Sequence, residues 1–344
     1  MYPLTELLFL SISALLSGVN EWQLTVIFGN EKLDWLRKFF PFENGIPSAD
    51  TLERLYSALD PVVFESCFRK WVNEISDLSD GEVIAIDGKT IGGSFDQASD
   101  ISAKHVVTAY ATQAHISLGQ ELTEQKSNEI TAIPRLLELL SIKGAMISID
   151  AMGCQKEIAR VIREKEADYL LAVKQNQKNL HQQVEKLFDR NTVRQVHTDR
   201  SVNHGRVEIR ICSVINELRF LDDKEYWRDL TSIIKLETEV FNKTTKKTTR
   251  STRYYISSAD KDAETFNRNI RSHWAIENNL HWMLDVSFSE DNSRRRKSNH
   301  AINFNLMAKT ALGLLKNNED KIPITHKRAK ASLNDLYREK LLNV

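Results

Sequence analysis

Two aspartates occur in the same local setting, each directly after a short apolar run. Asp87 follows residues 83–86 and Asp150 follows residues 146–149, and both runs are typical of buried β-strands. Glu277 lies far downstream, in a segment with a helical pattern. Carboxylate oxygens suit Mg²⁺ or Mn²⁺, and two such ions about 4 Å apart clamp the attacking and leaving oxygens of a phosphoryl transfer. The three acids are therefore candidate metal ligands for chemistry on phosphates.

A plain structural role competes with this interpretation, because a single aspartate after a strand is usually a surface or turn residue. Two such aspartates on neighbouring strands of one sheet weaken the structural alternative. Asp87 lies on the first strand, which we expect to be central, so we expect it to bridge two ions. Glu277 is preferred as third ligand because its helix can pack across the sheet, whereas Glu290 and Asp291 belong to a polar loop. These two and Asp285 stay rivals for that position.

Polar and basic side chains accompany the acids. Lys174 to Gln177 follow a predicted strand and would lie at the same end of the sheet as the aspartates. Two interpretations stay open for this segment: contact with DNA, or a loop that only starts a helix. The run Arg294 to Lys297 is either a solvated surface or a phosphate-neutralising cluster. His273 and His281 are interpreted as satisfied buried histidines, with phosphate contact as the alternative.

The composition limits the class of protein. The 344 residues are 41% hydrophobic and 27% charged, as in a soluble globular protein. The 47 basic and 47 acidic side chains cancel, so a nucleic-acid partner has to be argued from local clusters. Three widely spaced cysteines predict reduced thiols in a cytoplasmic protein. The apolar run Leu7 to Leu16 falls short of the roughly 20 residues of a membrane span, so we expect a buried helix and no membrane partner.

The residue pattern changes along the chain and predicts four parts. Residues 1–78 form a helical module with possible contact to DNA ends. Residues 79–193 and 258–320 form an α/β fold, a mixed sheet with flanking helices. Residues 194–257 are a β-rich insertion with a basic hairpin or loop at 242–253, and residues 321–344 are a basic C-terminal tail. The order β-β-β-α-β-α-β-α, with acids on strands one and four, resembles the ribonuclease-H-like arrangement.

Strand boundaries in the sheet are predicted from the same patterns. The first strand is expected to end at Asp87, with a turn at Gly88. Residues 104–113 and 116–125 are expected to form an antiparallel pair, and residues 168–173 the fifth strand.

The chain resembles bacterial insertion-sequence DDE transposases of the ISAs type, which include the H-repeat-associated proteins. The strings that carry the resemblance span nearly the whole chain: Gly45-Ile46-Pro47-Ser48-Ala49-Asp50-Thr51, Ile86-Asp87-Gly88-Lys89, Lys126-Ser127-Asn128-Glu129-Ile130-Thr131-Ala132-Ile133-Pro134, Ile149-Asp150-Ala151-Met152-Gly153-Cys154-Gln155, Leu171-Ala172-Val173-Lys174-Gln175-Asn176-Gln177, and His273-Trp274-Ala275-Ile276-Glu277-Asn278 continuing to Leu284-Asp285-Val286. The resemblance implies a ribonuclease-H-like catalytic domain with the triad Asp87, Asp150 and Glu277. It also implies two Mg²⁺ or Mn²⁺ ions per site, terminal-repeat and target DNA as partners, and a homodimer in the synaptic complex.

Two departures from the family pattern bear on the site. Many related DDE transposases place an arginine four residues before the glutamate and a lysine seven after it, where this chain has His273 and Leu284. We expect phosphate binding from a set of nearby polar and basic residues instead: Lys89, Lys174, Asn176, Arg271, His273, Arg294, Arg295, Arg296 and Lys297. The chain also starts directly at Tyr2-Pro3-Leu4, where such proteins commonly have additional residues.

The function expected from these features is metal-dependent DNA cleavage at insertion-sequence ends followed by strand transfer into target DNA. Two alternatives stay open. One is a catalytically inactive, truncated transposase relic that only binds DNA, which the short N-terminus favours and the intact triad disfavours. The other is a ribonuclease-H-like nuclease without strand joining.

Overall fold

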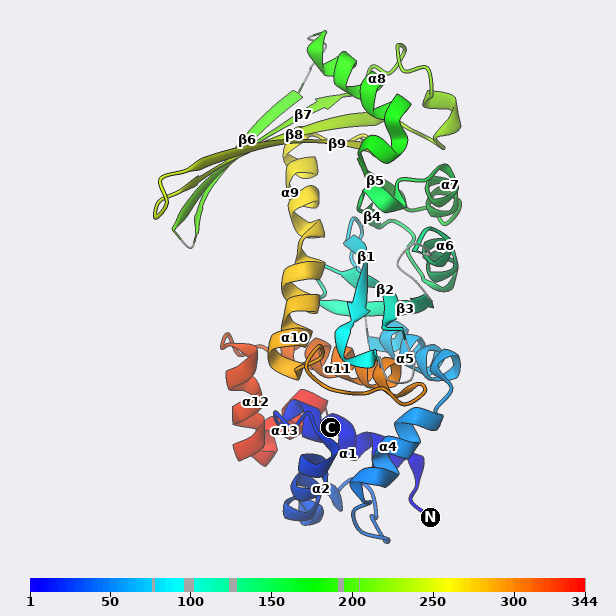
Figure 1. Cartoon of the computed structure of the whole chain (residues 1–344), viewed down its shortest axis with the longest axis vertical. Coiled ribbons are helices and arrows are strands. Elements are labelled where there is room, and N and C mark those ends of the chain that lie inside the picture. Colours follow the sequence, from blue (N-terminus) through cyan, green and yellow to red (C-terminus); the bar gives the residue numbers. More distant parts are fainter. Residues whose placement is uncertain (76–77, 96–101, 124–128, 191–194, 204, 344) are drawn as a thin grey trace.

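One nine-stranded mixed sheet runs through the chain, in the order β3-β2-β1-β4-β5-β9-β8-β7-β6 (Figure 1). The computed structural model describes residues 1–75, 78–95, 102–123, 129–190, 195–203 and 205–343. Residues 124–128, which include the start of the string at 126–134 and the end of the predicted strand 116–125, lie outside the described part. The strands are β1 (Val83–Ile91), β2 (Lys104–Ala111), β3 (Ile116–Thr123), β4 (Met146–Ile149), β5 (Asp168–Val173), β6 (Gln195–Asn203), β7 (Arg206–Ile215), β8 (Ser232–Asn242) and β9 (Thr248–Ser257).

The first strand does not end at Asp87 as predicted. β1 continues to Ile91, because residues 87–91 keep their antiparallel pairing with β2, from Asp87 opposite Thr108 to Ile91 opposite Lys104. Its parallel pairing with β4 does stop at Ile86. Asp87 is therefore the first residue of β1 without a partner on the β4 side. The predicted antiparallel pair is confirmed as β2 and β3, and the predicted fifth strand as β5.

The predicted β-rich segment extends the same sheet. Strands β6 to β9 pair antiparallel with one another, and β9 pairs with β5. β9 therefore covers the edge of β5, and β6 forms one outer edge of the sheet. The basic segment is a β-hairpin, since β8 and β9 join around residues 243–247.

Helices cover both faces of the sheet (Figure 1). On one face, apolar side chains of α6, α7 and α8 join the main core cluster with residues of β1, β2, β4 and β5. On the other face, Phe266 and Ile270 of α9 pack on Met146 and Leu170. A helical run continues from α9 through a π-helical turn, η7, into α10. The bounds are α6 (Glu129–Leu139), α7 (Lys156–Glu164), α8 (Lys178–Asp189), α9 (Ala263–His273), η7 (Ile276–His281) and α10 (Trp282–Phe288).

A bundle of N-terminal and C-terminal helices closes one end of the molecule (Figure 1). The segment that was predicted to be a basic tail forms two packed helices instead. The reason is that two of its arginines, Arg328 and Arg338, are buried, and Arg328 donates to the carbonyl of Leu15. The helices of the bundle are α1 (Leu4–Leu16), α2 (Trp22–Glu31), α3 (Leu33–Leu36), α4 (Ala49–Ala58), α5 (Pro61–Ile75), α11 (His300–Asn317), α12 (Ile324–Leu333) and α13 (Asp335–Leu342).

The apolar run Leu7 to Leu16 is part of the buried helix α1, as predicted. Among the described residues, no helix combines the length and the apolar character needed to cross a bilayer.

Candidate active site

Asp87 and Asp150 lie next to each other at one end of two neighbouring parallel strands. Ile86 pairs with Ile149, and each aspartate directly follows its member of that pair. Asp150 begins a short 3₁₀ turn, where its Oδ1 accepts a hydrogen bond of 3.0 Å from the backbone of Met152. Parallel pairing thus places both aspartates at the same end of the paired strands, as the strand patterns predicted.

Glu277 reaches this edge from the helical run on the face of the sheet. It is the second residue of η7, and its side chain is exposed. The negative charges of Asp150 and Glu277 both act on Asp87, so the three acids of the predicted triad share one electrostatic environment. Their role as a catalytic triad stays a prediction.

The carboxyl group of Asp87 has an unusual ionisation. It is 23% exposed. Burial raises its pKa to about 7, and the charges of Asp150, Glu277 and Glu129 act in the same direction. A hydrogen bond from the backbone of Gly88 only partly offsets these effects. A cation bound beside these acids would offset their negative charges. It would therefore favour the ionised form of Asp87.

The rival acids form a separate cluster. Among the described residues, Asp285, Glu290 and Asp291 are the group whose ligand oxygens all lie within 4.8 Å of one another. The Lys89 ammonium offsets part of its negative charge, since its Nζ contacts Asp285 and lies 2.7 Å from Glu290. Burial lowers the pKa of Lys89, but these two acids outweigh burial and raise it. We therefore assign Lys89, Asp285 and Glu290 to an internal ion-pair network.

Two expectations from the sequence change at this cluster. Glu290 was placed in a polar loop, but it is 3% exposed and accepts a hydrogen bond from Asn305. Lys89 was a DNA-binding candidate, but its side chain lies on the same face of β1 as Asp87 and points into the network. Long-range contacts across about 200 residues of sequence produce this ion pairing, so no local pattern indicated it.

The polar residues after β5 lie beside Asp150. Asn176 Nδ2 donates to the carbonyl oxygen of Ala151 at 2.6 Å, and Gln177 Nε2 donates to that of Cys154 at 2.9 Å. These hydrogen bonds tie the loop after β5 to the loop after β4. Lys174 begins the first loop and is exposed. The predicted neighbourhood of Lys174, Asn176 and Asp150 is thus present, and contact with DNA stays a prediction.

Two histidines of the helical run face the aspartates. Burial lowers the pKa of His273, and the neighbouring charge of Asp150 opposes that shift. The Nδ1 of His281 lies 3.5 Å from Asp87 Oδ2, and burial lowers the pKa of this ring to about 3, with help from Lys309, Lys89 and His105. Neither ring is fully satisfied, because His273 Nδ1 and His281 Nε2 are buried without a hydrogen-bond partner in the described structure.

The predicted basic residues divide between surface and interior. Arg294 is exposed, and Lys297 is exposed and pairs with Glu53 at 3.1 Å. Arg271 is exposed on α9, but it pairs with Asp199 of β6 at 2.9 Å.

Arg295 differs from the prediction, because it is 8% exposed and donates to the carbonyl of Asn20 at 2.6 Å. Its guanidinium also lies 3.3 Å from the ring centre of Phe304, so DNA cannot reach it in this conformation. Arg296 is partly buried beside Phe95.

A buried pair behind β1 was missed from the sequence. Glu129 Oε1 lies 2.6 Å from His105 Nε2, and His105 Nδ1 lies 2.9 Å from the hydroxyl of Thr90. A Cβ at Gly88 would lie 2.4 Å from Glu129, so the glycine leaves room for this pair. Glu129 belongs to one of the strings that carry the family resemblance, and this was the feature of the sequence that could have indicated a role for it.

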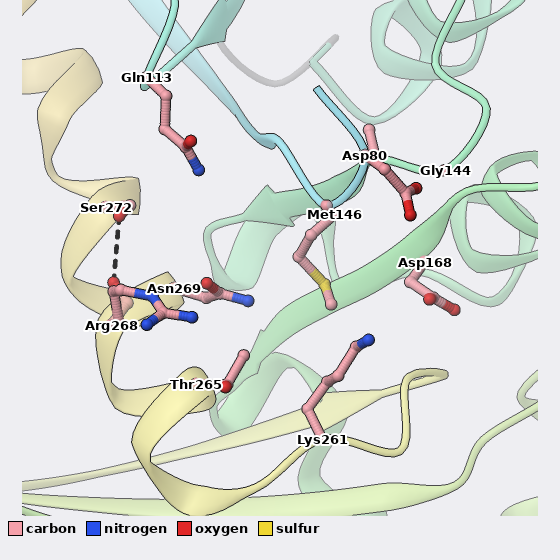
Figure 2. A pocket seen from close by; sticks show the side chains of 12 residues that line it. Asp80, Gln113, Gly144, Met146, Asp168, Lys261, Thr265, Arg268, Asn269 and Ser272 are labelled. Carbon is pink, nitrogen blue, oxygen red and sulfur yellow. Dashed lines mark hydrogen bonds between the residues drawn. The ribbon is translucent and has the colours of Figure 1, made fainter. Parts of the chain in front are cut away.

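A cavity of about 770 Å³ lies away from the acids, between α9 and the sheet (Figure 2). Met146 and Asp168, the first residues of β4 and β5, line it together with Arg268 and Asn269 of α9. Asp150 follows the last residue of β4, so the cavity lies at the opposite end of the parallel strands.

Comparisons with known proteins show the family of this chain. Residues 78–314 match the family model of the transposase DDE domain, and residues 1–72 match the model named DDE_Tnp_1-associated. The chain therefore belongs to the DDE transposase family, as the resemblance predicted.

Curated relatives place the chain more narrowly, beside the H-repeat-associated proteins. It is 44% identical to "Putative transposase YncI" of Escherichia coli O157:H7, over 99% of this chain and 89% of that protein. It is 39% identical to "H repeat-associated putative transposase YhhI" of Escherichia coli K12, over 99% and 92%. A solved piggyBac transposase synaptic complex with hairpin DNA aligns over 98% of this chain and 72% of its own, at 12% identity and a TM-score of 0.43.

Proposed function

We propose that this chain cleaves DNA at the ends of an insertion sequence in a metal-dependent reaction and joins those ends to target DNA. The observation that carries the proposal is the convergence of a helical glutamate with two aspartates that each follow the last paired residue of the parallel strands β1 and β4. Asp87 and Asp150 follow paired residues of parallel strands, and Glu277 acts on Asp87 from η7. Membership in the DDE transposase family supports the same reaction class.

The donor set of this site fits a divalent cation. Carboxylate oxygens are the ligands that Mg²⁺ and Mn²⁺ prefer, and the pKa of Asp87 is raised by burial first and then by the negative charges of Asp150 and Glu277. Two bound ions per site would stabilise the charge that develops on the attacking and leaving oxygens. Asp87 is best placed to serve both ions, because the charges of Asp150 and Glu277 both act on it.

The strand order supports a ribonuclease-H-like core. The five strands β3-β2-β1-β4-β5 combine an antiparallel β1-β2-β3 meander with parallel β4 and β5, and they carry the acids after the paired ends of β1 and β4. Strands β6 to β9 then form an insertion between this core and the helix of Glu277.

The proposed reaction has two steps at the same site. Water attacks a phosphodiester at the element end and releases a 3′ hydroxyl. That hydroxyl then attacks a phosphodiester of the target strand, which forms a new phosphodiester bond and releases the 3′ hydroxyl of the cut target strand. Exposed cations such as Lys174, in the loop beside Asp150, and Arg294 would neutralise DNA phosphates. By family resemblance we propose a homodimer as the synaptic form and the cytoplasm as its location.

A cleavage assay on element-end DNA with Mg²⁺ or Mn²⁺ tests the proposal. We expect Asp87→Ala and Asp150→Ala to abolish nicking and joining while DNA binding persists. Asp291→Asn, in the rival cluster, is the matched control and should remain active. Full activity in either aspartate variant would overturn the proposal. Wild-type binding without nicking would indicate a relic, and nicking without joining a nuclease.

A further inference from the structure

Glu277 is flanked by histidines at equal distances along the chain. His273 precedes it by four residues and His281 follows it by four. Residues four apart nearly share one face of an α-helix with about 3.6 residues per turn. Glu277 and His281 lie in the wider π-helical turn of residues 276–281, where their side chains also lie on nearly the same face. The helical run therefore presents three polar groups toward the two aspartates.

His281 is held against Asp87 by its surroundings. Its Nδ1 lies 3.5 Å from Asp87 Oδ2, and the ring is 12% exposed. Lys89, two residues after Asp87 on β1, donates from Nζ to the backbone carbonyl of His281 at 3.4 Å. The turn that carries the ring is thus tied to the strand that carries the carboxylate.

The unpaired nitrogen of the ring indicates its tautomer. His281 Nε2 is buried and has no hydrogen-bond partner among the described residues. A buried N–H without a partner is rarer in proteins than an unpaired acceptor. The tautomer with the proton on Nδ1 leaves only an acceptor unpaired, and it directs the N–H toward Asp87.

We propose that His281 is a positioning residue that holds Oδ2 of Asp87 and thereby orients the carboxylate toward the divalent-ion site. The inference rests on the proposed function, because it takes Asp87 to be a metal ligand. A separation of 3.5 Å is long for a hydrogen bond, and such contacts commonly tighten when the complete site assembles. Residues that orient metal ligands in this way typically change metal affinity by about 10-fold to 100-fold when they are removed.

A purely structural role for His281 makes a different prediction, which allows a test with three substitutions. His281→Asn keeps an N–H donor near the Nδ1 position but removes ring volume. His281→Leu keeps apolar volume but removes the donor. His281→Gln places its donor near the Nε2 position. If the ring only fills space, metal affinity will follow stability across the three variants.

The experiment is isothermal titration of the full-length protein with Mn²⁺, with urea unfolding of each variant as the measure of stability. Asp87→Asn tests the metal site itself. His300→Leu is the matched control, because it removes another buried histidine, one that accepts a hydrogen bond from Trp22. We expect His281→Leu and His281→Gln to weaken Mn²⁺ binding about 10-fold or more, and His281→Asn and His300→Leu to retain it.

Each outcome decides between the hypotheses. Retained binding in His281→Leu, or affinities that follow stability, would overturn the positioning role while leaving the metal site intact. Unchanged binding in Asp87→Asn, or no binding by the wild type, would overturn the proposed site and this inference with it. If His281→Leu does not fold, the contrast between His281→Asn and His281→Gln decides alone.

Discussion

Asp87 keeps its proton to a higher pH than an ordinary aspartate does. Its pKa is raised from 3.8 to about 7, by burial first and then by the charges of its acidic neighbours. The folded state therefore binds more protons than the unfolded chain between these two values. Stability from this group is fully present below pH 3.8 and is lost as the pH rises toward 7.

The first prediction concerns Asp87→Asn in metal-free protein. The amide does not titrate, so the variant should gain stability relative to wild type by about 1.4 kcal/mol per pH unit between roughly pH 4 and 7. Urea unfolding with EDTA at several pH values measures the difference. Asp222→Asn, at an exposed aspartate, is the control. A difference that does not change with pH would contradict the prediction.

Gly88 supports a second prediction at the residue scale. A Cβ there would lie 2.4 Å from Glu129 and 2.6 Å from His105, and these two side chains are buried and paired. Gly88→Ala should therefore destabilise the fold by about 1–3 kcal/mol through overpacking. Gly313→Ala, in the middle of α11, is the control, since its Cβ would meet only Ile116 at 3.6 Å. Equal midpoints of urea unfolding for the two variants would count against this account.

At the scale of elements, the C-terminal helices hold the N-terminal helices to the helical run that carries Glu277. Arg328 of α12 donates to the carbonyls of Leu15 in α1 and Ser287 in α10, and its guanidinium lies 4.3 Å from the ring centre of Phe288. One buried side chain therefore joins three helices that are far apart in the sequence.

Removal of this guanidinium tests the role of α12. Arg328→Ala should cost at least about 1–3 kcal/mol, because it leaves buried carbonyls without a donor. Hydrogen exchange should accelerate in α1 and α10 together. Arg219→Ala, at an exposed ion pair with Glu217, should change stability little. Loss of exchange protection confined to α12 would show that the three helices are not coupled through Arg328.

The order of elements could be predicted to a large extent, whereas their pairing could not. Short apolar runs predicted β4 and β5 closely, because a buried strand needs continuous hydrophobic residues. The extension of β1 past Asp87 was missed, since Gly88 reads locally as a turn and only pairing with β2 keeps it in the strand. The pairing of β5 with β9 joins residues more than 80 positions apart, such as Leu170 and Ser257, so no local pattern specifies it.

The candidate site shows the same division at the level of side chains. The positions of Asp87 and Asp150 at one edge were predictable, because parallel strands bring their carboxyl ends together. The ion-pair partners of Lys89 and the burial of Arg295 could not be predicted, because both depend on contacts with distant segments of the chain. Charge and spacing identify basic residues but do not say which of them face solvent.

At the scale of the whole molecule, a net charge of zero means that affinity for DNA has to come from local cations. Lys174 and Arg294 are two of the cations that were predicted to contact DNA, and both are exposed. Neither forms an ion pair with another described residue. Each phosphate contact contributes about 0.9 to the slope of log affinity against log salt.

Lys174→Ala and Arg294→Ala should therefore weaken binding of element-end DNA and lower that slope by about 0.9 each. Fluorescence anisotropy at several salt concentrations, without divalent ions, measures both quantities. Lys340→Ala, on α13 in the bundle, is the matched control for loss of one surface cation. An unchanged slope in both variants would exclude these residues from the DNA interface.

The sequence by itself determined the acids, the strands that carry two of them and the family to which the chain belongs. These features are local, since they depend on short runs of residue types that are read in order. The tertiary structure decided which acids lie close together, which cations form internal ion pairs and which histidine lies beside Asp87. Those outcomes depend on burial and on contacts between distant segments, and both arise only when the sheet and its helices pack.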